Sequence, residues 1–243
     1  MSDNAHTRSA EEVSALSRGI SRVMQARLIP QTAPRLDGYE IAAGTTTEDS
    51  GLGGSVWDWI DLGTGRVALL TLDVHQDGFP AAFHVGTARA VLRALVPEVL
   101  QVDRMLARAN DALSASAVEG LDQFVEVGLM LADAEGITWA SAGRVPGGII
   151  RRDGSFEEFA AHGPPLGMMG GFKYTMQRFP MAVGDTAFVL SRGSQGLALG
   201  AADLVAQLHG KPAGEVVGTL HRAIRKAQGE ERTETSVLYA RKH

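Results

Sequence analysis

The sequence predicts an α+β fold in which two antiparallel sheets pack face to face and helices lie outside. Short β-rich runs follow one another through glycine-containing turns, which is typical of antiparallel strands. Helical patterns form two groups, one between sets of strands and one near the C-terminus. The 243 residues are 44% hydrophobic, which suits one domain with a sizeable core.

The first half of the chain begins with a polar stretch over 1–10, which we expect to be disordered. Apolar residues then recur at spacings of three and four, which predicts a helix over 11–28 that ends before Pro30. YEIAAG is a strand candidate. SVWDWIDL and RVALLTLDV, joined by a GTG turn, predict a hairpin. The second of these strands is nearly all apolar over 67–72 and should be central in its sheet.

Helical spacing returns over 79–100, and Pro97 marks the place where that helix stops or restarts before a helical stretch that ends near Ser116. The remaining predicted elements are strands over 123–133, 137–143, 146–152, 155–160, 173–181 and 185–191, helices over 201–209 and 213–227, and a strand over 235–242. The total is about eight or nine strands.

Composition excludes several functional classes. The formal net charge is −5 and the basic residues are scattered, so we expect no nucleic-acid binding; the densest group, 221–228, is interpreted as the polar face of a helix. No run of about 18 apolar residues predicts a membrane span. The stretch MSDNAHTRSAEE lacks the apolar core of a secretory signal, and the chain has no cysteine, so a cytoplasmic location is expected.

Nine stretches, taken in order from Val23 to Arg241, resemble the metal-dependent 2C-type (PPM) serine/threonine protein phosphatases, and more closely their bacterial stage II sporulation E and RsbU-like branch. They are QARLIPQTAPRLDGYEIAAG, LGGSVWDWIDL, LDVHQDGFPAA, ARANDAL, FVEVGLMLAD, WASAGRVPGGIIRRDG, PPLGMM, GDTAFVLSRGSQGL and TETSVLYARK. The resemblance implies a four-layer α-β-β-α sandwich. It also implies an N-terminal regulatory or dimerisation helix over 11–30 and a phosphatase-like domain over 31–243.

In this family two manganese or magnesium ions activate a water molecule that attacks a phosphoserine or phosphothreonine ester. The resemblance implies four aspartate ligands and one backbone carbonyl. Only Asp73 is kept, followed by the carbonyl of Val74. The other three ligand positions fall on Ser55, Arg192 and Thr233.

Further positions at the site also differ from the family pattern. Arg144 replaces a histidine, and Glu126 replaces a threonine. The family's glycine-rich turn is Gln76-Asp77-Gly78 in this sequence. The resemblance places further residues at the lining of the site: Gly54, Asp77, Gly78, Gly193 and Glu234. Arg192 would also repel two cations that have a single carboxylate ligand. At a separation of about 4 Å and an effective dielectric constant near 20, the repulsion is about 4 kcal/mol per unit charge. We therefore predict that no two-metal centre forms, that no cofactor is needed, and that Arg192 pairs with Asp73.

Displaced acids remain an alternative. Residues Glu48, Asp49, Asp77, Glu126 and Glu234 lie near the aligned loops and could rebuild a site for one manganese or magnesium ion. Asp58 should face away from Ser55 and act structurally, because strand residues alternate. Trp57 and Trp59 should belong to the core. His75 and His84 are expected to face solvent or pack rather than bind a metal.

These observations predict a pseudophosphatase, a phosphatase-like domain that binds a regulatory protein without hydrolysing its phosphoester. The family resemblance suggests a STAS-type anti-sigma antagonist or a switch kinase as partner, in a sigma-factor signalling pathway, and a homodimer formed through the N-terminal helix. An active phosphatase with a single-metal site is the alternative. A purely structural dimer module is a third candidate.

Overall fold

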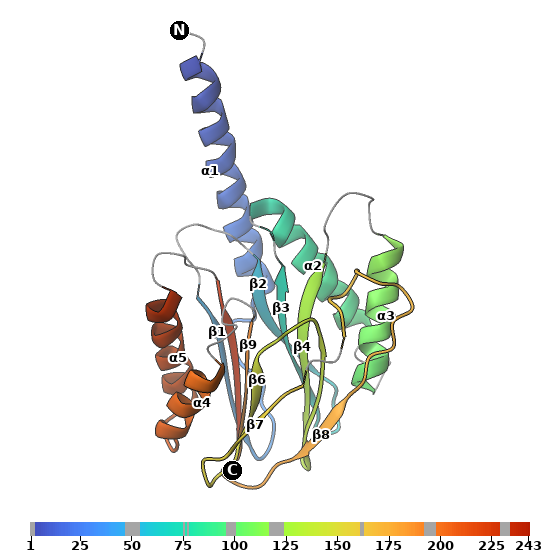
Figure 1. Ribbon diagram of the computed structural model, residues 1–243, viewed down its shortest axis with the longest axis vertical. Helices are drawn as coiled ribbons and strands as arrows, with labels where there is room; N and C mark the ends of the chain where they lie inside the picture. The colour runs from blue at the N-terminus through green and yellow to red at the C-terminus, as the bar shows by residue number, and fades with distance from the viewer. Residues whose placement is uncertain are drawn as a thin grey trace.

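The computed structural model describes residues 3–46, 54–74, 76, 78–95, 101–116, 124–160, 163–191, 198–228 and 234–243. The expected two-sheet sandwich is confirmed, with helices outside both sheets (Figure 1). One sheet has the spatial order β1 (Tyr39–Thr45), β10 (Ser236–Lys242), β9 (Thr186–Leu190), β6 (Gly147–Ile150) and β7 (Phe156–Glu158). The other has the order β2 (Ser55–Asp61), β3 (Val67–Val74), β4 (Val125–Asp133), β5 (Gly136–Ala142) and β8 (Gln177–Pro180).

All strand pairs in both sheets are antiparallel. The predicted hairpin is β2 and β3, joined by a turn at Gly63, Thr64 and Gly65 in which all three residues have positive φ. Strand β3 lies between β2 and β4, and every side chain from Val67 to Leu72 is buried. An apolar strand enclosed on both faces therefore lies inside its sheet, with a neighbouring strand on each side, as its composition predicts.

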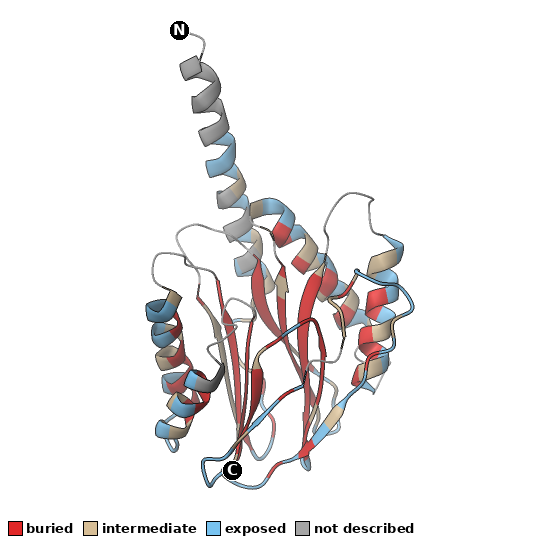
Figure 2. Cartoon of the chain, in the orientation of Figure 1, coloured by how far each residue is buried: buried red, intermediate tan, exposed pale blue. Residues whose placement is uncertain are grey.

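Helices cover the outer face of each sheet. The pair α2 (Gly78–Leu95) and α3 (Val102–Ala115) packs on the β2–β3–β4–β5 face, and the pair α4 (Ala198–Gln207) and α5 (Ala213–Gln228) packs on the other sheet (Figure 1). Three apolar clusters result, one under each helix pair and one between the sheets. Figure 2 shows that strands β2 to β6, β9 and β10 are buried along most of their length, that the strands β1, β7 and β8 are more exposed, and that helices α2, α3 and α5 are buried on their inner sides.

Helix α1 (Asp3–Leu28) projects beyond the sandwich (Figure 1). It begins at Asp3, earlier than the Glu11 that the sequence predicts. Its C-terminal end packs on α2, where the methyl groups of Leu28 lie close to Gly86. The division into a tail, a regulatory helix and a phosphatase-like domain stays a prediction.

Two details differ from the sequence-based elements. Strand β8 covers only Gln177–Pro180 of the predicted 173–181, because the residues before it pair with no neighbouring strand. Ten strands occur in the described part of the chain, rather than eight or nine, since short segments such as β7 are held by pairing that sequence periodicity does not reveal.

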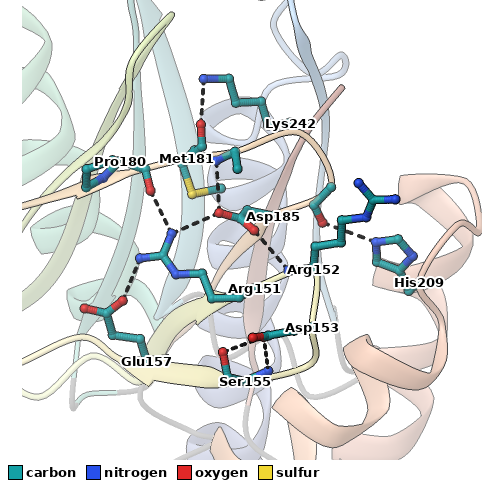
Figure 3. Close-up of polar contacts among 12 residues, drawn as sticks. Arg151, Arg152, Asp153, Ser155, Glu157, Pro180, Met181, Asp185, His209 and Lys242 are labelled. Carbon is teal, nitrogen blue, oxygen red and sulfur yellow. Dashed lines mark hydrogen bonds and ion pairs between the residues drawn. The ribbon is translucent and has the colours of Figure 1, made fainter.

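A buried carboxylate fixes one end of the first sheet (Figure 3). Asp185 precedes β9 and accepts hydrogen bonds from the Arg151 guanidinium at 2.9 Å and from the backbone N–H groups of Arg152 and Ala182, both at 3.0 Å. Arg151 also pairs with Glu157 at 2.6 Å. This network connects β6, β7 and β9 at the N-terminal end of β9, whereas Ser191 follows the C-terminal end of that strand.

Candidate functional site

Three polar residues form a row across the second sheet, at the end where β3 leads to α2. Ser55 on β2 pairs with Asp73 on β3, and Asp73 pairs with Glu126 on β4. Residues that are directly opposite on antiparallel strands project to the same face. Their parity matches that of Trp57, Leu69 and Met130, which belong to the cluster between the sheets. The row therefore faces the other sheet.

Hydroxyl groups of the first sheet meet this row. The Ser55 hydroxyl donates to Ser191 Oγ at 3.0 Å and lies 2.9 Å from Ser236 Oγ, which in turn lies 2.8 Å from Thr45 Oγ1. The Ser236 backbone N–H also donates to Ser191 Oγ at 3.0 Å. Ser55, Ser191 and Ser236 are all buried. The position that the resemblance assigns to a ligand aspartate thus takes part in hydrogen bonds between the two sheets.

Glu126 is a buried acid at the same site, with a side chain only 7% exposed. Burial raises its pKa to about 7, and the nearby backbone N–H and charge of Arg144 oppose this shift only in part. Its Oε1 accepts from the Arg144 backbone N–H at 3.4 Å. A Cβ on Gly143, which has φ +86, would lie 2.6 Å from its Cγ, so Gly143 makes room for this carboxyl. Burial therefore favours the neutral form of this carboxyl.

The loop positions around Asp73 approach one another closely. The Val74 N–H donates to the Gly54 carbonyl at 2.9 Å, and a Cβ on Gly54 would lie 3.0 Å from the Val74 carbonyl oxygen. Gly78 begins α2 with φ +74. Glu234 is buried two residues before the start of β10. The structure brings Gly54, Val74 and Asp73 close together.

Several predicted site residues lie outside the described part of the chain. They are Glu48, Asp49, His75, Asp77, Arg192, Gly193 and Thr233. The predicted pairing of Arg192 with Asp73 therefore stays a prediction.

The described donors do not fit a pair of divalent cations. Such cations require several anionic oxygen ligands, but the Ser55 hydroxyl is committed to Ser191 and Ser236, and burial favours the neutral form of Glu126. Among the residues that the structure describes, no group of three or more His, Asp or Glu side chains could hold a metal ion.

Asp58 has the structural role that strand alternation predicts. It lies on the opposite face from Ser55, buried under α2, and forms ion pairs with Arg89 and Arg93, each at 2.8 Å. Burial raises the pKa of Asp58, and the two guanidinium groups oppose that shift. The ion pairs attach α2 to β2.

The aromatic and histidine predictions near the site can also be placed. Trp57 is buried between the sheets, whereas Trp59 is half-buried against the same cluster and donates to the Thr32 carbonyl at 2.8 Å. His84 is half-buried and its Nδ1 lies 3.0 Å from Gln76 Oε1, so it packs against the loop.

The residues that sequence reasoning missed are the partner hydroxyls, Ser191, Ser236 and Thr45. Strand alternation gives a signal for them. Each lies an even number of residues from an apolar residue that faces inward on the same strand or its continuation, such as Val189 or Leu238. Which inward polar residues meet across the interface depends on how the two sheets are placed, which a single sequence does not specify.

Solved structures show the same fold, that of PP2C-type phosphatase domains. The SiaA PP2C domain of Pseudomonas aeruginosa is 18% identical with a TM-score of 0.79, and the match covers 97% of this chain and 99% of that one. The PP2C phosphatase domain with a regulatory fragment of SpoIIE from Bacillus subtilis is 16% identical, with a TM-score of 0.73 and coverage of 86% and 64%. The RsbU and RsbW domains of a Mycobacterium tuberculosis protein are 21% identical, with a TM-score of 0.74 and coverage of 86% and 63%.

The chain thus spans less than two thirds of the length of the last two structures. No curated protein sequence matches it. The family model for stage II sporulation protein E (SpoIIE) matches residues 63–241. The chain belongs to the SpoIIE family of PP2C-type phosphatase domains.

Within the described residues, no helix is both long enough and apolar enough to cross a membrane. The cytoplasmic location stays a prediction from the sequence.

Proposed function

We propose that this chain is a pseudophosphatase that binds a regulatory protein in a signalling pathway and does not hydrolyse its phosphoester. The observation that carries the proposal is the state of Ser55. Its hydroxyl stands at a ligand position of the family and is bonded to Ser191 and Ser236 instead. A neutral, buried and fully engaged hydroxyl is a poor ligand for a divalent cation.

The proposed partner is a STAS-type anti-sigma antagonist or a switch kinase in sigma-factor regulation. One support is that a similar structure combines RsbU and RsbW domains in one protein, and another that a further neighbour belongs to the bacterial stressosome. Both likenesses lie below 25% identity, so they serve as analogy for the class of partner.

Titration with manganese tests the proposal. Isothermal titration of Mn²⁺ into the chain should give no binding tighter than about 1 mM, because the described donors include few charged oxygens. Stoichiometric uptake of two ions at micromolar concentration would reject the pseudophosphatase. Calcium, titrated in the same buffer, controls for weak association with surface carboxylates.

A second candidate function is an active phosphoserine or phosphothreonine phosphatase that uses one manganese or magnesium ion. The register favours this candidate, since Glu126 lies directly across from Asp73 and adds a carboxyl that the family pattern lacks. Manganese-stimulated release of phosphate from a phosphopeptide, lost in both Asp73→Asn and Glu126→Gln but kept in the exposed Glu158→Gln, would establish it. Absence of turnover in the unmodified chain would exclude it.

We further propose that α1 pairs two copies of the chain. Four of its apolar side chains, Val13, Leu16, Ile20 and Val23, are between 41% and 67% exposed. Their spacing of three, four and three residues is that of a coiled-coil seam. A projecting helix gains stability when a second helix covers such a seam.

A further inference from the structure

Four hydroxyl groups form a chain of hydrogen bonds between the two sheets at the candidate site. Its members, which we call the hydroxyl bridge, are Thr45, Ser236, Ser55 and Ser191, and successive oxygens are 2.8, 2.9 and 3.0 Å apart. Thr45 and Ser236 belong to strands of the first sheet, and Ser191 follows β9 of that sheet. Only Ser55 comes from the second sheet. Each hydrogen bond of the bridge that connects one sheet to the other therefore involves Ser55.

The direction of each hydrogen bond in the bridge follows from the number of protons that each hydroxyl can donate. Each hydroxyl has one proton to donate. Ser55 donates to Ser191, so Ser236 must donate to Ser55, and Thr45 must then donate to Ser236. The Ser236 backbone N–H also donates to Ser191 Oγ. A chain that runs in one direction polarises each successive bond and strengthens it.

Burial makes the bridge sensitive to the loss of any member. Ser55 and Ser191 are each 1% exposed, and Ser236 is fully buried. Water cannot easily replace a missing partner at such positions, so truncation of a member removes hydrogen bonds that water does not restore. Truncation of Ser55 would affect both Ser191 and Ser236.

An aspartate at position 55 would be incompatible with this arrangement. A carboxylate has no proton to donate to Ser191. It would also stand directly across from Asp73, and two carboxylates at opposite positions of a sheet are destabilising. The site is thus built for a neutral hydroxyl at this position.

We infer that the hydroxyl bridge joins the two sheets at the end of the sandwich where the family resemblance places the metal ligands, so that the sheets are held together there without a cation. The inference rests on the proposed function only in treating position 55 as a former ligand position. Its consequences concern stability, which can be measured without any assay of phosphatase activity.

Thermal unfolding in the presence of EDTA tests the bridge. Ser55→Ala and Ser236→Ala should each lower the Tm by about 3–8 °C, as expected for buried hydrogen bonds in a domain of this size. The double variant should lose clearly less than the sum, because both substitutions remove the same bond. Ser55→Asp should lower the Tm at least as much as Ser55→Ala.

Thr71→Val is the matched control. Thr71 is buried on the same face of β3, two residues from Asp73, and its hydroxyl has no hydrogen-bond partner among the described residues. Its replacement should leave the Tm unchanged or raise it. The bridge is refuted if Ser55→Ala behaves like this control, if the two alanine effects simply add, or if Ser55→Asp is as stable as the unmodified chain.

Manganese distinguishes this inference from the proposed function. A rise in the Tm of the unmodified chain on adding Mn²⁺ would count against the pseudophosphatase. The losses measured in EDTA would still report on the bridge, since no metal is present there. No effect of Mn²⁺ together with those losses supports both.

Discussion

Asp58 and Ser55 lie on the same strand but have different partners because their side chains project to opposite faces of the sheet. Asp58 meets two arginines of α2 under the helix layer, whereas Ser55 meets two serine hydroxyls between the sheets. A carboxylate is stable where fixed positive charges compensate its burial. A hydroxyl is suited to a position whose neighbours are also hydroxyls. Local surroundings thus decide which polar residue each face accepts.

The buried His221 predicts that the stability of the folded chain depends on pH. It lies on α5 against β1, so close that a Cβ on Gly44 would be 2.7 Å from its Cε1. Burial lowers its pKa below the ordinary 6.5; the backbone of Gly44 opposes this shift and Arg225 adds to it. The folded chain therefore favours the neutral ring, and the unfolded chain takes up the proton first as the pH falls. Stability that is present above about pH 6.5 should be lost below it.

Replacement of His221 by glutamine should reduce this loss. We expect the free energy of unfolding, measured by urea denaturation at about pH 7.5 and about pH 5.5, to fall less in His221→Gln than in the unmodified chain. The exposed His243→Gln serves as the control and should retain the full dependence. Equal pH dependence in all three proteins would contradict the assignment to His221.

At the scale of elements, the segment 163–171 is held beside the site by bonds to its backbone. Leu166 pairs with Val125, which precedes Glu126, and the Gly143 N–H donates to the Gly163 carbonyl at 2.9 Å. From α3, Asn110 donates to the Met169 carbonyl at 2.6 Å and accepts from the Gly167 N–H at 3.0 Å. An irregular segment is thus fixed by partners from β4, β5 and α3.

Asn110→Ala should release this segment. Asn110 is fully buried, and its loss would leave the Gly167 N–H and the Met169 carbonyl without those bonds. We expect a loss of about 2–3 kcal/mol in the free energy of unfolding and faster amide hydrogen exchange at Gly167. The exposed Arg108→Ala on the same helix should change stability by less than about 0.5 kcal/mol. Unchanged exchange at Gly167 would show that other contacts hold the segment.

At the scale of the whole molecule, four layers account for the distribution of apolar residues, and α1 is the exception. Its exposed apolar seam leads us to expect a dimer of the unmodified chain in light scattering after size-exclusion chromatography. The double variant Leu16→Glu, Ile20→Glu should be a monomer with a similar Tm, because these side chains lie outside the sandwich core.

The control for the dimer is Ala15→Glu, which places the same charge on the opposite side of the helix. It should remain a dimer. A monomeric unmodified chain at all concentrations tested, or equal dissociation of the Ala15 variant, would contradict pairing through the seam.

Much of the fold could be predicted because it depends on local patterns. The apolar run 67–72 predicted a central strand, the glycine turn predicted the β2–β3 hairpin, and helical spacing predicted the outer layers. The position of β8 and the existence of β7 depended on pairing with distant strands. Pairing between residues far apart in sequence leaves little trace in either segment alone.

The identity and order of the residues were enough to predict the class of the fold, because strand alternation, helical spacing and turn residues are local patterns. That Ser55 occupies a ligand position stays a prediction from the family resemblance. Only the tertiary structure decided that Ser55, Ser191 and Ser236 meet between the sheets and that Glu126 is buried with a raised pKa. The physical reason is that hydrogen bonding and desolvation depend on distances between strands that the packing of the two sheets brings together.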